Sequence, residues 1–361
     1  MSAAEELLAE RDIATVEAIL HRGGERLRAR MAAAETYIES VLRSVAPPLA
    51  TYASETILAG GKRLRPLLVM IAAEASPGRR SAGSRAAQEA GEWGAEHALG
   101  EQVEPALTRA AVAVELIHSA TLVHDDLIDK ASIRRGRPTV AVRGGKAAAI
   151  ATGDVLFSRA FAELARNGDA AQLRTLSDAS TALAAGEFLQ REDAYAERVS
   201  VKRYLRRCEL KTAALFEAAC RLGTLAAAPR DGALASALGS FARSVGLAFQ
   251  LLDDVLDVSG QERATGKGRG TDLLDGTVTL PLILARECDP ELAALDLRSL
   301  RGPAEAEQLC ERIAATGALA EARAWALDVV GKAKAALPAD LDRRALGLLR
   351  LVADAVVERS R

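Results

Sequence analysis

The pattern Asp-Asp-x-x-Asp occurs twice in the sequence, first at Asp125, Asp126 and Asp129 and again at Asp253, Asp254 and Asp257. A helix turns 100° per residue, so positions i, i+1 and i+4 point within an arc of about 100° and the three carboxylates share one face. Such carboxylates repel one another unless cations lie between them, and they suit Mg²⁺, which binds carboxylates together with the oxygens of a substrate phosphate. A solvated acidic face would be the better explanation for one copy alone. Both copies follow apolar stretches that predict buried helix ends, where unpartnered carboxylates are costly, and this favours a metal site.

Basic residues recur beside these motifs. The segment GGKRLRP places Lys62 and Arg65 behind two glycines at a predicted helix start, where backbone amides and cations together bind phosphate. The other candidates follow the acidic motifs or lie on a later helix: Arg134, Arg135, Lys211, Thr212 and Lys267. A surface cluster would explain any one of these groups. Taken together, carboxylates that hold metal and guanidinium groups that hold diphosphate form one coherent site.

The composition predicts that helices position these residues. Only 3% of the 361 residues are aromatic, while Ala, Leu, Arg and Glu, which favour helices, recur throughout. Apolar residues are commonly spaced i, i+3, i+4 and i+7, as at Ala113, Leu116, Ile117 and Ala120, and alternating patterns are scarce. We therefore expect an all-α fold, with helices over 10–43, 47–60, 64–75, 105–128, 146–166, 171–191, 201–222, 231–258, 279–287, 303–315, 317–335 and 340–359.

Charge, apolar runs and cysteine spacing exclude several classes of protein. The formal net charge of −2 lacks the basic excess of a non-specific nucleic-acid binder. No apolar run approaches the roughly 20 residues of a membrane span, and the acidic N-terminus does not resemble a signal peptide. The four cysteines are widely spaced and predict neither a zinc site nor a disulfide scaffold. The sequence thus predicts a cytoplasmic protein with no transmembrane segment and no nucleic-acid partner.

One segment, residues 76–104, is rich in Gly, Ser, Ala and Glu and lacks apolar periodicity. Long segments of this kind inside a domain are usually disordered or functional. We expect a flexible insertion within a single domain that spans residues 1–361.

Seven motifs occur in the order typical of one family, and the chain resembles a trans-isoprenyl diphosphate synthase of the polyprenyl synthetase family. They run from Gly60 to Pro281 and read GGKRLRP, ELIHSATLVHDDLID, RRGRPT, GEFLQ, LKTAALF, FQLLDDVLD and TGKGRGTDLLDGTVTLP. The resemblance implies a bundle of antiparallel helices around a central cavity, with both acidic motifs facing each other at its mouth. It also implies a homodimer.

The resemblance also assigns roles to individual residues. Mg²⁺, about three ions per active site, would be held on the allylic diphosphate by both motifs, Asp125, Asp126, Asp129, Asp253, Asp254 and Asp257. Isopentenyl diphosphate would be bound by Lys62, Arg65, His118 and Arg135. The allylic diphosphate would be bound or oriented by Arg134, Lys211, Thr212, Gln250 and Lys267. A histidine in a largely apolar helix is also often a hydrogen-bonded core residue, which is the alternative for His118.

The chemistry implied is ionisation, condensation and elimination. Metal and cations stabilise the departing diphosphate, and the double bond of isopentenyl diphosphate attacks the allylic cation. No protein nucleophile is required, which agrees with the lack of a Ser-His or Cys-His arrangement in the sequence. A Lys often occurs in the family where this chain has Thr277, so a phosphate contact is missing here, for which Arg269 is a candidate substitute.

Small residues precede the first acidic motif where short-chain enzymes of this family tend to carry aromatic ones. They are Ala120 and Thr121, and the deeper positions on the same helix are Ile117 and Leu116. Small side chains at these positions leave room for the growing product to extend between the helices, at roughly 5 Å of depth per isoprene unit. The prediction is therefore a C30–C50 polyprenyl diphosphate, with geranylgeranyl diphosphate (C20) as the alternative. Plain core packing is the competing explanation for these side chains.

Two further alternatives concern the reaction itself. A terpene cyclase of similar fold would normally lack a second Asp-Asp-x-x-Asp motif and the GGKRLRP segment, and both are present here. A silent subunit of a heteromeric synthase would lose its acidic motifs, so this alternative requires that activity depends on a second protein. An apolar product also favours loose association with a membrane.

Overall fold

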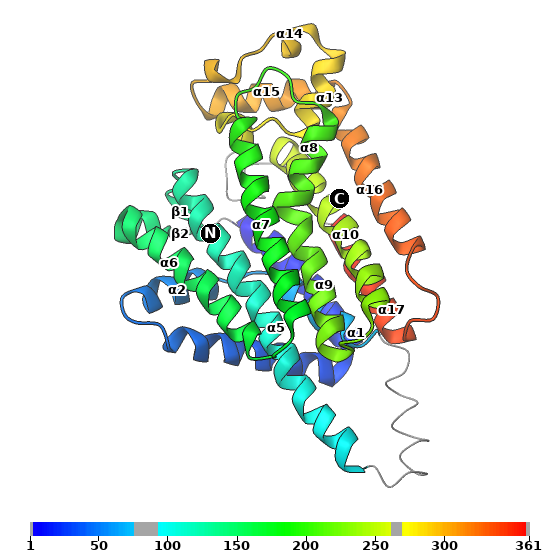
Figure 1. Ribbon diagram of the computed structural model, residues 1–361. Coiled ribbons are helices and arrows are strands. Elements are labelled where there is room, and N and C mark those ends of the chain that lie inside the picture. Colours follow the sequence, from blue (N-terminus) through cyan, green and yellow to red (C-terminus); the bar gives the residue numbers. More distant parts are fainter. Residues whose placement is uncertain (1–2, 76–92, 261–268, 359–361) are drawn as a thin grey trace.

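Helices rich in Ala, Leu, Arg and Glu build almost all of the described chain, so the all-α prediction is confirmed (Figure 1). The computed structural model describes residues 3–75, 93–260 and 269–358. The N-terminal part consists of α1 (Ala3–Arg43), α2 (Leu49–Leu58) and α3 (Leu64–Ala72). Helix α1 is interrupted at Gly24, whose φ of 69° is not helical.

The central part holds the helices that carry both acidic motifs. In chain order its elements are α5 (Trp93–Ile128), β1 (Ile133–Arg134), β2 (Arg137–Pro138), α6 (Val140–Ala165), α7 (Ala170–Glu192), α8 (Val201–Cys208), the π-helical turn η2 (Glu209–Ala213), α9 (Ala214–Ala227) and α10 (Gly232–Ser259). The remaining elements are α12 (Thr271–Leu274), α13 (Leu280–Cys288), α14 (Pro290–Ala293), the 3₁₀ turn η3 (Leu297–Ser299), α15 (Pro303–Ala315), α16 (Ala318–Ala335) and α17 (Arg343–Glu358).

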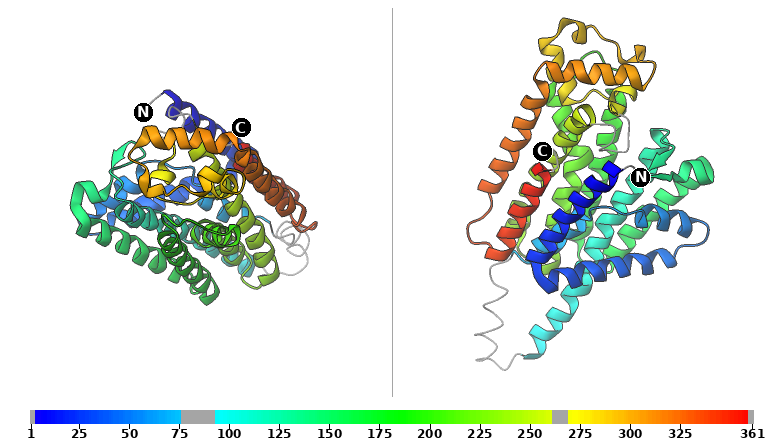
Figure 2. Two further views of the ribbon diagram at one scale, coloured as in Figure 1. Left: turned by 90° about the horizontal axis from the view of Figure 1, so that it is seen from above. Right: turned by 180° about the vertical axis from the view of Figure 1, so that it is seen from behind.

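The core lies between the long central helices. Helix α5 packs along α6 and α9, and α10 packs along α9 and α16. Elements α13 to α15 cross one end of this bundle, at the top of Figure 1. The view from behind in Figure 2 shows α1, α16 and α17 on the opposite side, where α17 contacts both other helices. The ends of α5 and α10 that carry the acidic motifs lie toward the end of the bundle covered by α13 to α15.

The predicted start of the helix at residue 105 and the predicted extent of the insertion are wrong, and one hairpin was not predicted. Helix α5 begins at Trp93 rather than at residue 105, since Pro105 lies inside the helix and Glu104 is tied to α1 through Arg26 and Arg30. Residues 93–104 are therefore helical, while residues 76–92 of the expected insertion lie outside the described residues. The turn between α5 and α6 forms a two-stranded antiparallel hairpin, in which Arg134 pairs with Arg137.

Two helices, at Val103–Ile128 and Gly232–Ser259, are long and apolar enough to cross a membrane by composition alone. In these helices 67% and 50% of the apolar stretch is buried inside the bundle, which accounts for their composition. They are α5 and α10, the two helices that end in the acidic motifs.

Candidate active site

The first acidic motif lies at the end of α5, with Asp129 just beyond the last helical residue, and each of its carboxylates lies near a cation. Arg134 of the hairpin donates a hydrogen bond from Nε to Oδ1 of Asp126 at 2.5 Å. Asp129 forms an ion pair with Arg191 of α7. Burial raises the pKa of Asp125 to about 6, an effect that the nearby positive charge of Lys211 opposes. All three carboxylates of the motif are therefore placed where they interact with positively charged groups.

Glu187 of α7 holds two of the cations in place. Its carboxylate forms an ion pair with Lys211 of η2 and accepts a hydrogen bond from Nε of Arg191 at 3.1 Å. The preceding Gly186 allows α7 to approach η2 closely, because a Cβ at this position would lie 2.4 Å from the backbone nitrogen of Lys211. The π-helical turn brings Lys211 and Thr212 to this side of the bundle, and such turns occur frequently at functional sites.

The second acidic motif lies near the end of α10. Asp253 is exposed, whereas Asp254 is buried and accepts hydrogen bonds from Tyr204 and Gln250. Burial raises the pKa of Asp254 to about 7, while these two hydrogen bonds oppose the shift. Asp257 accepts a hydrogen bond from the backbone nitrogen of Asp272, so it also fixes the start of α12.

A continuous series of contacts joins the two motifs. From Asp129 it passes through Arg191 and Glu187 to Lys211, and from the adjacent Thr212 through Gln250 to Asp254. The bundle thus brings together the two motifs and the LKT segment, as the sequence predicts.

The donor chemistry fits Mg²⁺, although the carboxylates are not gathered in advance. Among the described residues, no three Asp, Glu, His or Cys side chains lie close enough together to form a ready-made metal site. The oxygens of both motifs are hard ligands, and Arg134 and Arg191 place positive charge against them in this structure. Divalent ions, held by these carboxylates, would supply positive charge there in place of the guanidinium groups.

A cationic group lies beside the first motif. The guanidinium of Arg135 lies against Gly61, where a Cβ would be 3.1 Å from Nη2, and Gly60 adopts a φ of +92° that favours glycine. The Nε of Arg65 is buried and has no hydrogen-bond partner among the described residues. Burial lowers the pKa of Arg65 to about 10, so its side chain stays charged at neutral pH. A buried, unsatisfied guanidinium nitrogen fits an anionic ligand such as a diphosphate.

His118 belongs to the same group. Burial lowers its pKa well below 6.5, and the positive charges of Arg65, Arg135 and Arg134 add to this effect. The imidazole is therefore neutral at physiological pH and interacts with a ligand as a hydrogen-bonding group. Lys62, on the loop that contacts Arg135, completes the four residues predicted to bind isopentenyl diphosphate.

Arg63, the middle cation of GGKRLRP, has a role that was not predicted from the sequence. Arg63 has a left-handed backbone, with φ 47°, and its side chain turns inward to Glu35 and Glu115. It also donates a hydrogen bond to the carbonyl oxygen of Ile57 at 2.9 Å. The only available signal was Glu115, an acidic residue within an otherwise apolar stretch of α5.

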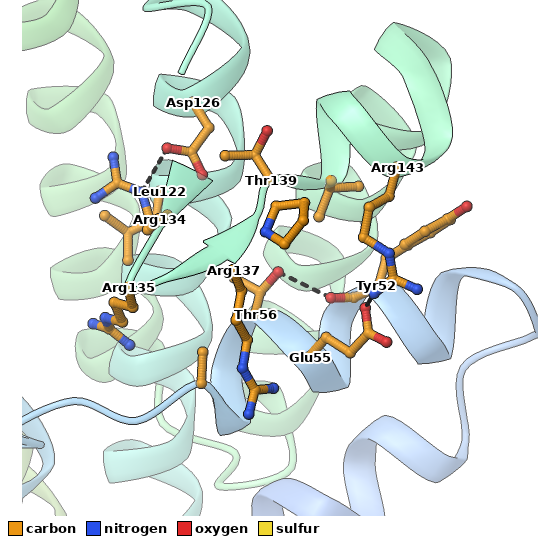
Figure 3. A pocket seen from close by; sticks show the side chains of 13 residues that line it. Tyr52, Glu55, Thr56, Leu122, Asp126, Arg134, Arg135, Arg137, Thr139 and Arg143 are labelled. Carbon is orange, nitrogen blue, oxygen red and sulfur yellow. Dashed lines mark hydrogen bonds and ion pairs between the residues drawn. The ribbon is translucent and has the colours of Figure 1, made fainter. Parts of the chain in front are cut away.

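A pocket of about 270 Å³, also missed, adjoins the first motif between α2, the hairpin and α6 (Figure 3). Asp126 and Arg134 form one side of it, and the Arg143–Glu55 ion pair with Tyr52 forms the other. Its arginines extend the positive surface beside the predicted diphosphate site.

Comparison with known proteins agrees with this geometry. The family model for polyprenyl synthetases matches residues 47–315, which include both motifs and the cationic group. The chain belongs to the polyprenyl synthetase family.

Two relatives and one solved structure illustrate the similarity. Heptaprenyl diphosphate synthase component 2 of Geobacillus stearothermophilus is 37% identical over 265 residues, 73% of this chain and 75% of the relative. Geranylgeranyl diphosphate synthase of Methanosarcina mazei is 36% identical over 269 residues, 73% of this chain and 75% of the relative. The crystal structure of a polyprenyl synthase from Caulobacter crescentus, complexed with calcium and isoprenyl diphosphate, matches with a TM-score of 0.80 and 34% identity. That match covers 94% of this chain and 97% of the other.

The side chains predicted to meet the growing product lie on the inner face of α5 in this polyprenyl synthetase. Leu116, Ile117 and Ala120 are fully buried in the hydrophobic core. Thr121 is half-buried, and its hydroxyl donates to the carbonyl oxygen of His118 at 2.8 Å. Burial of this kind is what both a product wall and plain core packing require.

The segment after the second motif departs from the pattern typical of polyprenyl synthetases. Lys267 lies outside the described residues. Arg269 donates from Nε to the carbonyl oxygen of Val258 at 2.5 Å, which holds its side chain at the end of α10. Thr277 donates from its backbone nitrogen to the carbonyl oxygen of Asp272. A phosphate contact from Arg269 in place of the missing Lys stays a prediction.

Proposed function

We propose that this polyprenyl synthetase condenses isopentenyl diphosphate with an allylic diphosphate, in the 1′-4 sense, to give an all-trans polyprenyl diphosphate. The observation that carries the proposal is the series of contacts from Asp129 to Asp254, which joins two carboxylate motifs at one end of an apolar bundle. The buried, unsatisfied Nε of Arg65 supports a second diphosphate site beside them.

In the proposed reaction, the bond between the allylic carbon and the diphosphate oxygen breaks, and the diphosphate leaves with the electron pair. Lys211 and Arg134 bind the departing oxygens, and bound Mg²⁺ would supply further positive charge there. Lys62, Arg65, Arg135 and the neutral His118 hold isopentenyl diphosphate so that its double bond attacks the allylic carbon. Loss of a proton to the released diphosphate completes the new alkene.

The proposed product has 30 to 50 carbons, because Ala120 and Thr121 leave the wall next to the first motif small. The name of the relative from Geobacillus stearothermophilus supports a long chain, and that of the relative from Methanosarcina mazei supports C20. The test supplies purified protein with Mg²⁺, isopentenyl diphosphate and, in parallel, allylic diphosphates of 5 to 20 carbons, with products identified by mass spectrometry. A ladder ending at C30 or beyond supports the proposal, and a sharp stop at C20 identifies a geranylgeranyl diphosphate synthase. Cyclic hydrocarbons without consumption of isopentenyl diphosphate would identify a terpene cyclase.

The proposed assembly is a homodimer that is active alone. Large apolar side chains are exposed on the outer helices, with Ile150 of α6 40% exposed and Phe188 of α7 64% exposed, which favours a surface covered by a second chain. A relative whose name includes "component 2" raises the alternative of a heteromeric synthase. Light scattering coupled to size exclusion measures the assembly, and product formation by the purified chain alone distinguishes the two alternatives.

A further inference from the structure

Tyr204 of α8 is a fully buried tyrosine whose hydroxyl group contacts the second acidic motif. It donates a hydrogen bond to Oδ2 of Asp254 at 2.6 Å, and Asp254 is itself only 4% exposed. The other oxygen of this carboxylate, Oδ1, accepts from Nε2 of Gln250 at 2.7 Å. Neighbouring Asp253 is exposed, so the two adjacent carboxylates differ in their surroundings.

The orientation of the Gln250 amide follows from these contacts. Both oxygens of Asp254 accept hydrogen bonds in this structure, one of them from the amide nitrogen of Gln250, and this turns the amide oxygen away from Asp254. That oxygen, Oε1, accepts a hydrogen bond from the hydroxyl group of Thr212 at 2.6 Å. The Thr212 hydroxyl hydrogen is therefore used in the bond to Gln250, and the lone pairs of the hydroxyl oxygen can face a substrate in the active site.

Contacts of Arg207 hold the Tyr204 ring in place, so that its hydroxyl group stays directed at Asp254. The guanidinium of Arg207, one turn further along α8, lies 5.3 Å from the centre of the Tyr204 ring. Arg207 also donates to the carbonyl oxygen of Val278 at 2.7 Å, which ties α8 to the segment before α13. Helix α8 continues directly into η2, so the residue that begins the chain of hydrogen bonds and the one that ends it lie on one continuous helical stretch.

We propose that Tyr204 is a positioning residue, which acts through Asp254 and Gln250 to fix the orientation of the Thr212 hydroxyl group toward the allylic substrate. The inference rests on the proposed function, in which positive charge develops on the allylic carbon. Lone pairs of Thr212 stabilise that charge, whereas a hydroxyl hydrogen pointing at it would not.

The test is a double-mutant cycle on the single-turnover rate of the first condensation. Tyr204→Phe removes only the hydroxyl group, and Thr212→Val removes the group that it orients. We expect Tyr204→Phe to lower the rate about tenfold, with the KM for isopentenyl diphosphate unchanged, and to have no further effect in the Thr212→Val background.

Tyr37→Phe is the matched control. Tyr37 donates an equivalent 2.6 Å hydrogen bond to the carboxylate of Glu163, but it is not part of the series of hydrogen bonds from Tyr204 to Thr212. It should leave the rate within about twofold of the parent protein in both backgrounds.

A Tyr204→Phe effect that multiplies with that of Thr212→Val, or no effect at all, would overturn the inference while leaving the proposed function intact. If the wild type makes no product from any allylic diphosphate, the proposed function fails and the inference fails with it. If Tyr204→Phe does not fold, judged by circular dichroism, Tyr204 is replaced by 3-fluorotyrosine, which keeps the hydroxyl group and changes its acidity through the ring fluorine, and the same cycle applies.

Discussion

Arg191 of α7 forms an ion pair with Asp129, the last carboxylate of the first acidic motif. The same guanidinium is held by Glu187, which also binds Lys211. Arg191 thus occupies a position next to a carboxylate that is predicted to bind Mg²⁺, and the ion pair must break before the metal can bind there.

Replacing Arg191 by Gln is expected to lower the concentration of Mg²⁺ that gives half-maximal product formation. A partly exposed ion pair contributes about 1 kcal/mol, which corresponds to about a fivefold change. The measurement is a Mg²⁺ titration of product formation for the wild type and the variant. Arg166→Gln, which removes an ion pair with Glu163 elsewhere in the bundle, is the control and should leave the titration unchanged. A higher Mg²⁺ requirement for Arg191→Gln would mean that Arg191 helps to bind the substrate.

Replacing Ala120 by Phe should shorten the product while condensation continues. Ala120 is fully buried one turn before the first motif, so a phenyl ring there would close the path between α5 and its neighbours. Overpacking of this kind also costs about 1–3 kcal/mol of stability. Mass spectrometry of the products gives the chain length. Ala326→Phe on α16, at an equally buried position, controls for the loss of stability and should not shorten the product. An unchanged length for Ala120→Phe would place the end of the product elsewhere.

Helix content and the grouping of the acidic motifs were predictable from the sequence because they depend on local patterns. The stripe from Ala113 to Ala120 lies on the buried face of α5, as its spacing predicts. The Thr212–Gln250 pair could be anticipated only through the family resemblance, since the two residues are far apart in the chain and meet through packing of η2 against α10.

Other features depend on long-range contacts that no local pattern encodes. Nothing near Tyr204 in the sequence indicates that its hydroxyl group reaches Asp254. The π-helical turn arises within a sequence that predicts an ordinary helix over 201–222. From the sequence alone, Arg63 resembles a ligand-binding cation, and only the structure shows that it pairs with Glu115 of a distant helix.

His118 gives a prediction about pH. Because its pKa in the folded protein is well below 6.5, the unfolded chain binds more protons below that pH, and the free energy of unfolding falls as the pH falls. His118→Gln removes this dependence. Between pH 7.5 and pH 5.5, the wild type should lose up to about 1.4 kcal/mol of stability relative to the variant, as measured by urea denaturation. A difference that stays constant with pH would mean that His118 titrates normally in the folded state.

Arg63 gives a prediction about stability, because it neutralises a buried carboxylate. Glu115 is 4% exposed and pairs with Arg63, which also bonds to Glu35. Arg63→Met leaves the charge of Glu115 buried, which costs about 3–5 kcal/mol, whereas the Arg63→Met/Glu115→Leu double variant removes both charges and should be the more stable of the two. Urea denaturation at neutral pH measures both.

The same pair of variants separates the stability of the fold from the positioning of the GGKRLRP loop. The double variant no longer carries the unpaired Glu115 carboxylate, but it still lacks the hydrogen bond from Arg63 to the carbonyl oxygen of Ile57, which fixes the loop that carries Lys62. Its KM for isopentenyl diphosphate should therefore stay above that of the wild type even when its stability recovers. If KM recovers together with stability, the loop is positioned without Arg63, and its inward-turned side chain serves only to neutralise Glu115.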